Sequence, residues 1–219
     1  MENLYIQQLE AFGRTLPNID VVESRLPSEV FEIITNEIEN PSKELEQYNK
    51  NLLGHVKEEY SLNHIKDEIE EYFIQIAQQW TQNNPGVLES SEEVRKATKW
   101  DFMLEDIWVN KQKKYEFNPM HLHSGVLSFV IYVKIPYDLE EENKVFPDTT
   151  GGESHTSKFY FAYSDILGRQ RQLTLPVDKS WEGVMIMFPA TLNHGVNPFY
   201  TSDEYRITVS GNMAIKVHE

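Results

Sequence analysis

The sequence predicts a mainly β protein, in which a double-sheet barrel is flanked by helices from the N-terminal half. Up to about residue 98, apolar residues recur at spacings of three and four, which is typical of amphipathic helices. Beyond that point, short runs rich in β-branched and aromatic residues alternate with turn signals, which is typical of strands. We therefore expect residues 1–98 to form a helical region that packs on a β core of residues 99–219.

Two helices are expected in the first half. Residues 28–40 place apolar side chains on one stripe, with Ser28 as the expected N-cap and Pro41 just beyond the end. Residues 62–82 repeat apolar positions at spacings of three and four, with acidic residues on the opposite face. The breaker Asn-Asn-Pro-Gly at 83–86 ends this second helix.

The second half is expected to consist of strands. The clearest run, LSFVIYVKI at 127–135, is rich in β-branched and aromatic residues and is followed by Pro136. The acidic segment 138–143 is expected to be a solvated connection. The expected strands are 100–110, 127–135, 158–163, 172–177, 183–188 and 206–217.

Composition excludes several classes of site. The 219 residues contain no cysteine, so disulfides, thiolate zinc sites and iron–sulfur clusters are excluded, and any metal must be held by His, Asp or Glu. The net charge of −15 disfavours binding to nucleic acid. No apolar run is long enough for a membrane span and no signal peptide is visible, so we expect a cytoplasmic protein.

Three of the seven histidines lie where a metal site is easy to build. His121 and His123 form an H-x-H pair before the strongest strand, and in an extended chain alternate side chains point the same way. His194 follows another apolar strand by a few residues and could complete a three-ligand set from across the barrel. The alternative is that all three are surface or hydrogen-bonded core residues.

Arg206 enters the last expected strand twelve positions after His194. A guanidinium inside an apolar barrel is costly unless it is paired, and it is suited to bidentate binding of a carboxylate. The alternative is a surface cation paired with Asp203 or Glu204.

Three stretches of the sequence resemble the 2-oxoglutarate- and Fe(II)-dependent oxygenases. They are WVN at 108–110 through EFNPMHLHSG at 116–125, VMIMFPATLNHGV at 184–196, and RITVSGN at 206–212. Together they look like the branch of these oxygenases common in bacteriophages. The resemblance covers about residues 100–217 and implies a double-stranded β-helix (jelly-roll) oxygenase core.

The resemblance implies roles for individual residues. His121 matches the first histidine of the family's H-x-D/E iron motif, and His194 matches the distal iron histidine. Arg206 matches the residue that binds the far carboxylate of 2-oxoglutarate, with Thr208 beside it. Tyr132 resembles a position from which some members hydrogen-bond this cosubstrate.

One position departs from the family motif, because His123 stands where the motif has an acidic residue. Three alternatives follow: His123 supplies the third metal ligand, an acid such as Asp138 or Glu153 supplies it, or the site is open or degraded. We favour His123. A neutral imidazole in place of a carboxylate leaves one more positive charge on the metal centre.

The resemblance implies a dioxygenase, or hydroxylase, that uses Fe(II), 2-oxoglutarate and O₂. Its prime substrate is a small molecule or a protein and is not specified by the sequence, and a homodimer is possible. One alternative is a non-catalytic jelly-roll module that binds a partner or belongs to a virion. Another is a cupin-like three-histidine dioxygenase that does not use 2-oxoglutarate; Arg206 would then have no carboxylate to bind.

Overall fold

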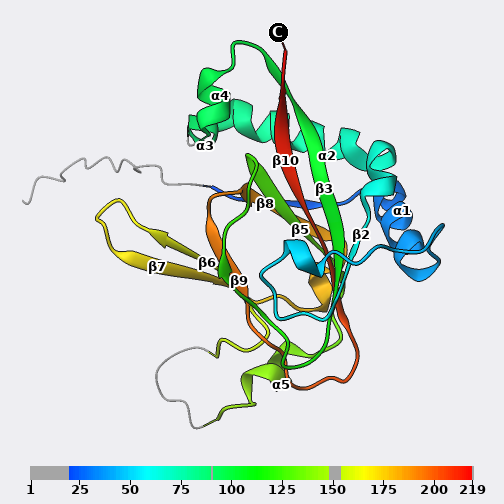
Figure 1. Ribbon diagram of the computed structural model, residues 1–219. Helices are drawn as coiled ribbons and strands as arrows, with labels where there is room; N and C mark the ends of the chain where they lie inside the picture. The colour runs from blue at the N-terminus through cyan, green and yellow to red at the C-terminus, as the bar shows by residue number, and fades with distance from the viewer. Residues whose placement is uncertain (1–19, 90, 148–153, 219) are drawn as a thin grey trace, which may run out of the picture.

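The computed structural model describes residues 20–89, 91–147 and 154–218, and these form two antiparallel sheets accompanied by α-helices (Figure 1). The larger sheet contains, in spatial order, β1 (Val22–Arg25), β8 (Val184–Pro189), β5 (Leu127–Lys134), β10 (Arg206–Val217), β3 (Trp100–Gln112) and β2 (Glu58–Ser61). The smaller sheet contains β4 (Asn118–His121), β9 (Asn193–Val196), β6 (Phe159–Ser164) and β7 (Gln170–Leu175).

The helices come mostly from the N-terminal half. They are α1 (Ser28–Glu39), α2 (Lys66–Asn83), α3 (Gly86–Glu89), α4 (Glu92–Lys96) and α5 (Leu139–Asn143), with short 3-10 turns at Asn49–Asn51, Asn63–Ile65 and Lys179–Trp181. Figure 1 shows α1 and α2 on one side of the molecule and the β6–β7 hairpin extending away on the other. No helix in the described part of the chain is both long and apolar enough to cross a membrane.

Strand β5 shows how the larger sheet separates two cores, because successive side chains in a strand point to opposite faces. Leu127, Phe129 and Ile131 belong to the core shared with the helices. Val130 and Tyr132 belong to the core between the two sheets. The two faces of one strand thus bury against different layers.

The contact between α2 and the larger sheet includes a stacked aromatic pair. The rings of Phe73 and Phe129 lie with centroids 4.4 Å apart and planes at 13°. Both side chains are buried. Helix α2 is therefore fixed to the strand that runs beside the site described below.

Both expected long helices are present, although the expected cap is wrong. Helix α1 begins at Ser28, but Pro27 occupies the N-cap position and no side-chain hydrogen bond caps the helix. The fixed φ of proline suits a helix start, so the N-cap lies one position before the expected Ser28. Helix α2 spans Lys66–Asn83, within one residue of its expected end.

All six expected strands are present within a few residues of their expected ends, but four strands were not predicted. They are β1, β2, β4 and β9, and each has only four residues. Such short segments carry too few alternations to show a period of two, and their strand form comes from pairing with neighbouring strands.

Segment 138–143 is mostly exposed, as expected for a solvated connection, but it also forms a short helix and buries one residue. Asp138 caps the short helix α5 by accepting hydrogen bonds from Glu140 N and Glu141 N. Glu142 is wholly buried, and its carboxylate accepts hydrogen bonds from the backbone N–H groups of Tyr200 and Thr201. A carboxylate that is buried among N–H donors has the partners it needs, and here it ties two loops together.

Candidate metal centre

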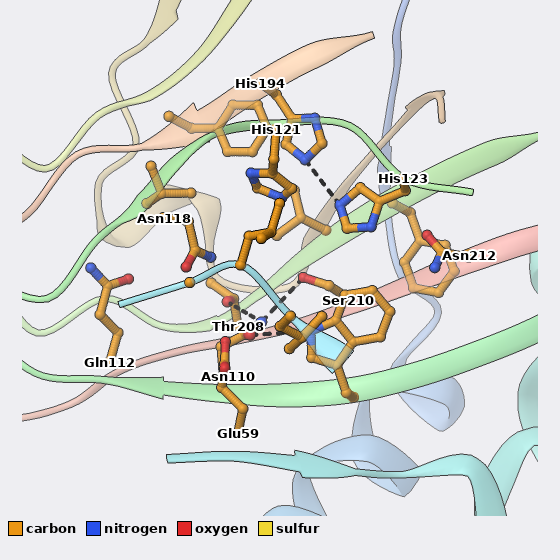
Figure 2. Close-up of a pocket in the computed structure, with 18 of the residues that line it drawn as sticks. Glu59, Asn110, Gln112, Asn118, His121, His123, His194, Thr208, Ser210 and Asn212 are labelled. Atoms are coloured by element: carbon orange, nitrogen blue, oxygen red, sulfur yellow. Dashed lines mark hydrogen bonds between the residues drawn. The ribbon is translucent and has the colours of Figure 1, made fainter. Parts of the chain in front are cut away.

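The three predicted metal-binding histidines lie together at the inner side of the smaller sheet. His121 on β4 and His194 on β9 are directly paired residues of adjacent strands. His123 lies just beyond β4, where its backbone N–H donates to Ala190 O at 2.9 Å. One ring nitrogen from each residue lies within 4.8 Å of the other two. Figure 2 shows the imidazoles turned toward one another at one side of a pocket.

Backbone hydrogen bonds fix the tautomers of two of these imidazoles. His121 Nδ1 lies 2.7 Å from Pro119 O, and His194 Nδ1 lies 2.9 Å from Leu192 O. A carbonyl oxygen only accepts, so each Nδ1 carries the proton and each Nε2 exposes a lone pair. The same arrangement orients metal-binding histidines in known sites.

Burial keeps all three imidazoles neutral. It lowers the pKa of His194 to about 3 and that of His123 to about 4, with an additional effect of the nearby His121. Burial also lowers the pKa of His121. The site therefore presents neutral imidazoles, which is the form that binds a divalent ion.

The spacing of the nitrogens fits a metal ion. Nε2 of His123 and Nε2 of His194 are 3.2 Å apart. Two nitrogens that are each ~2.1 Å from an ion and at right angles to each other lie ~3.0 Å apart. Without an ion, one of these nitrogens must donate a proton to the other. With an ion, both can direct lone pairs at it, so the donor set fits a divalent transition metal.

Asp138, one of the two acidic alternatives, does not join this cluster. Asp138 lies at the N-terminus of α5, where it caps the helix. Glu153 lies outside the described residues. In the described ranges, the group of metal-binding side chains around His121 contains histidines only. Among the three alternatives left open by the sequence, the geometry favours His123 as the third ligand.

The histidines line a cavity of about 480 Å³, called here the central cavity, between the two sheets. Its floor is polar, because β3 and β10 direct amide and hydroxyl groups into it. Asn110 Nδ2 donates to Thr208 Oγ1 at 3.3 Å and to Ser210 Oγ at 3.2 Å (Figure 2). Farther along, Ser128 Oγ donates to Asn212 Oδ1 at 2.8 Å.

Arg206 also lines the central cavity and is only 2% exposed, so the alternative of a surface cation is wrong. Asp203 and Glu204 instead pair with lysines. The five N–H groups of the guanidinium donate to neutral acceptors, which are Gln112 Oε1, Tyr137 Oη, Ser157 O and Asn197 O. No carboxylate of the described residues pairs with Arg206, so its buried positive charge is uncompensated.

Two hydroxyl groups near this cation have no partner. Tyr132 Oη and Ser157 Oγ are buried, line the central cavity and make no hydrogen bond. The pKa of Tyr132 is raised by burial, so its hydroxyl stays protonated and can donate. Thr208 Oγ1 accepts from Asn110, which leaves its own proton free to donate. Unpaired donors beside an uncompensated cation fit an anionic ligand, and the residues present therefore fit 2-oxoglutarate.

The sequence analysis missed several polar residues of the central cavity. The signal that could have shown them is the alternation on β10, where Arg206, Thr208, Ser210 and Asn212 are polar at every second position. Polar side chains on the inner face of a central strand indicate a ligand site. Glu59 and Asn118 had no such signal, because β2 and β4 were not predicted as strands.

Comparisons with known proteins agree with this geometry. Residues 106–212, which include every histidine and arginine discussed above, match the family model described as "Putative 2OG-Fe(II) oxygenase". The matched segment is therefore similar to oxygenases that depend on Fe(II) and 2-oxoglutarate. No curated protein matches the sequence.

Solved structures show the fold. A prolyl-4-hydroxylase from Pseudomonas putida superposes with a TM-score of 0.52 and 13% sequence identity, over 92% of this chain and 94% of that chain. An oxidoreductase of the 2OG-Fe(II) oxygenase family from Burkholderia pseudomallei gives a TM-score of 0.38 and 16% identity, over 53% of this chain and 47% of that chain. The first likeness shows that the two-sheet architecture is one that oxygenases use.

Proposed function

We propose that this protein is an Fe(II)- and 2-oxoglutarate-dependent oxygenase whose metal is held by His121, His123 and His194. The observation that carries the proposal is the convergence of three neutral imidazoles within 4.8 Å of one another in the cavity that also contains Arg206. When bound there, Fe(II) with 2-oxoglutarate and O₂ would supply the oxidising chemistry that the family match implies.

The residues of this chain would supply binding and orientation. Pro119 O and Leu192 O hold the rings of His121 and His194 with their Nε2 atoms toward the ion. The distal carboxylate of 2-oxoglutarate would accept hydrogen bonds from Tyr132 and Thr208. The charge of Arg206 would stabilise that carboxylate, although its N–H groups already have protein acceptors.

Two alternatives are less well supported. A cupin-like dioxygenase without 2-oxoglutarate gives no role to the unpaired cation of Arg206 and the unpaired hydroxyl of Tyr132. A non-catalytic module gives no role to three neutral histidines whose ring nitrogens lie within 4.8 Å of one another. Both features are explained together by an oxygenase that binds 2-oxoglutarate.

Finer features of the proposal rest on the sequence resemblance. We propose that the two sheets are the double-stranded β-helix of this family, that the chain belongs to a phage-type branch, and that it acts in the cytoplasm, of the host if the protein is viral. Its partner is a small-molecule or protein substrate, nucleic acid is disfavoured by the charge of −15, and a homodimer remains open to test. The division into residues 1–98 and 99–219 stays a prediction.

Succinate formation from 2-oxoglutarate tests the proposal. The purified protein with Fe(II), a reductant and 2-oxoglutarate is expected to form succinate slowly without any prime substrate. His194→Ala removes one of three ligands, so the rate is expected to fall to the level without protein. Titration with Co(II), followed by its visible absorption, gives a second measurement that does not depend on turnover.

Asn193→Ala is the matched control, since Asn193 is the exposed neighbour of His194 on β9. It is expected to retain Co(II) binding and succinate formation. Equal succinate formation by the wild type and the His194 variant would refute the assignment of the metal ligands.

A further inference from the structure

A buried carboxyl group lies in the central cavity and has no role in the proposed metal and 2-oxoglutarate sites. Glu59 is on β2, at the edge of the larger sheet, where it pairs in register with Asn110. Its side chain is 1% exposed and lines the central cavity. In the view of Figure 2, Glu59 lies on the side of the pocket away from the three histidines.

Half of this carboxyl group has no partner. Glu59 Oε2 accepts a hydrogen bond from Asn49 Nδ2 at 3.1 Å, whereas Glu59 Oε1 is buried and makes none. Asn118 Oδ1, which also lines the cavity, is likewise buried without a partner. Two unpaired acceptors in one cavity call for a ligand that donates hydrogen bonds.

The absence of a side chain at Gly54 lets both of these oxygens lie close to the backbone. A Cβ atom placed on Gly54 would lie 2.1 Å from Asn118 Oδ1 and 3.3 Å from Glu59 Oε1. Both acceptors therefore approach the same point beside the backbone of Gly54. Any larger residue at position 54 would occupy that point.

Charge indicates which kind of donor fits. In the described part of the chain, Glu59 forms no ion pair with a Lys, Arg or His side chain. Burial and the nearby Glu116 raise the pKa of Glu59 to about 7, as expected for a buried carboxyl group without a cationic partner. A ligand that brings a positive charge would compensate this carboxylate.

The walls of the central cavity also suit a cation. Tyr48 and Trp108 line it as a stacked pair, with ring centroids 5.5 Å apart and planes at 24°. Aromatic rings attract ammonium and guanidinium groups. The net charge of −15 favours the approach of cations to the whole protein.

We infer that Glu59 and Asn118 bind a cationic nitrogen of the prime substrate, so that the substrate is an amine or a guanidine. This inference rests on the proposed function, because it is the shared cavity that brings the remainder of such a substrate toward the histidines. The cation could belong to a small molecule or to a basic side chain of a protein, since both present the same group.

Calorimetric titration of the full-length protein tests the inference. The cationic probes are L-lysine, L-arginine and the blocked peptides Ac-Gly-Lys-Gly-NH₂ and Ac-Gly-Arg-Gly-NH₂. Each has a neutral counterpart with norleucine in place of lysine or citrulline in place of arginine. At least one cationic probe is expected to bind about tenfold more tightly than its counterpart. Tighter binding of the free amino acid indicates a small-molecule substrate, and tighter binding of the peptide indicates a protein side chain.

Three variants localise the effect. Glu59→Gln keeps the shape of the side chain and is expected to abolish the preference for the cation. Glu58→Gln makes the same change on the preceding residue, whose side chain points to the other face of β2 and contacts Tyr205, and it is expected to retain the preference. Gly54→Ala leaves the carboxylate intact and is expected to weaken cation binding, because the added Cβ would displace the side chain of Asn118.

The outcomes separate this inference from the proposed function. Equal binding of cationic and neutral probes, or a preference that survives in Glu59→Gln, would overturn the inference even if the wild type forms succinate. Absence of both succinate formation and Co(II) binding would overturn the proposed function, whatever the probes show.

Discussion

Replacing Glu59 by glutamine should stabilise the protein relative to the wild type, and this gain in the free energy of unfolding should increase as the pH rises. Glu59 is buried without a cation, so folding raises its pKa from 4.5 to about 7. The folded state then holds the proton more tightly than the unfolded state does. This carboxyl group therefore favours folding most below pH 4.5, and that contribution is lost as the pH rises toward 7.

The size of the effect follows from these two pKa values. Between pH 5 and pH 8, protonation linkage at Glu59 lowers the free energy of unfolding of the wild type by about 2.5 kcal/mol. Glutamine has no such titration. Its side-chain oxygen can accept the hydrogen bond from Asn49. The variant should therefore gain about 2.5 kcal/mol over the wild type when the pH is raised from 5 to 8.

Urea denaturation of metal-free protein at pH 5 and pH 8, with unchanged slopes, measures this difference. Taking the difference between variant and wild type cancels the titration of all other groups. Glu58→Gln controls for the chemical change on the same strand, and the pH-dependent gain should be confined to the Glu59 variant. A stability difference between Glu59→Gln and wild type that is the same at both pH values would refute the claim that this carboxyl group is buried and uncompensated.

Three further predictions concern the cosubstrate site, the packing of α2 on the larger sheet, and the metal ligands. Tyr132→Phe removes a buried hydroxyl that has no partner, so unfolding by urea should be little changed, while the 2-oxoglutarate concentration for half-maximal succinate formation should rise about tenfold. A loss of stability without this rise would argue against a role in cosubstrate binding. Phe73→Ala removes the ring stacked on Phe129 and should lower the free energy of unfolding by about 3–5 kcal/mol, with a loss near zero showing that α2 is not anchored there. His123→Asp should retain Co(II) binding because it places a carboxylate at the third ligand position, whereas His123→Ala should weaken Co(II) binding at least tenfold. Equal Co(II) affinities of the two variants would show that His123 is not a ligand.

Long elements were predictable because each carries several repeats of its period. Helix α2 has 18 residues and strand β10 has 12, so each shows its period clearly. The four-residue strands β1, β2, β4 and β9 are defined by their neighbours in the sheet, which sequence periodicity does not show. Two of them, β4 and β9, carry the paired His121 and His194, so the strands hardest to predict position the candidate metal centre.

The sequence by itself determined which kinds of metal site were possible and which residues could form one. With no cysteine available, the candidates were His121, His123 and His194, and Arg206 was the candidate carboxylate receptor. The candidates follow from side-chain chemistry and from local spacing along the chain, and their individual roles follow from the resemblance to a known family.

Only the tertiary structure decided which charges are compensated. It places Arg206 in the interior with neutral acceptors alone. It places Glu59 in the wall of the same cavity, where no cationic side chain of the described residues pairs with it. Glu58 and Tyr205, which are 147 positions apart in the chain, come into contact only after β2, β3 and β10 pair in the larger sheet. The free-energy cost of burying a charge depends on the groups that surround it in space. For this reason the sequence predicted a role for Arg206 and none for Glu59, and it did not show which partners either residue has.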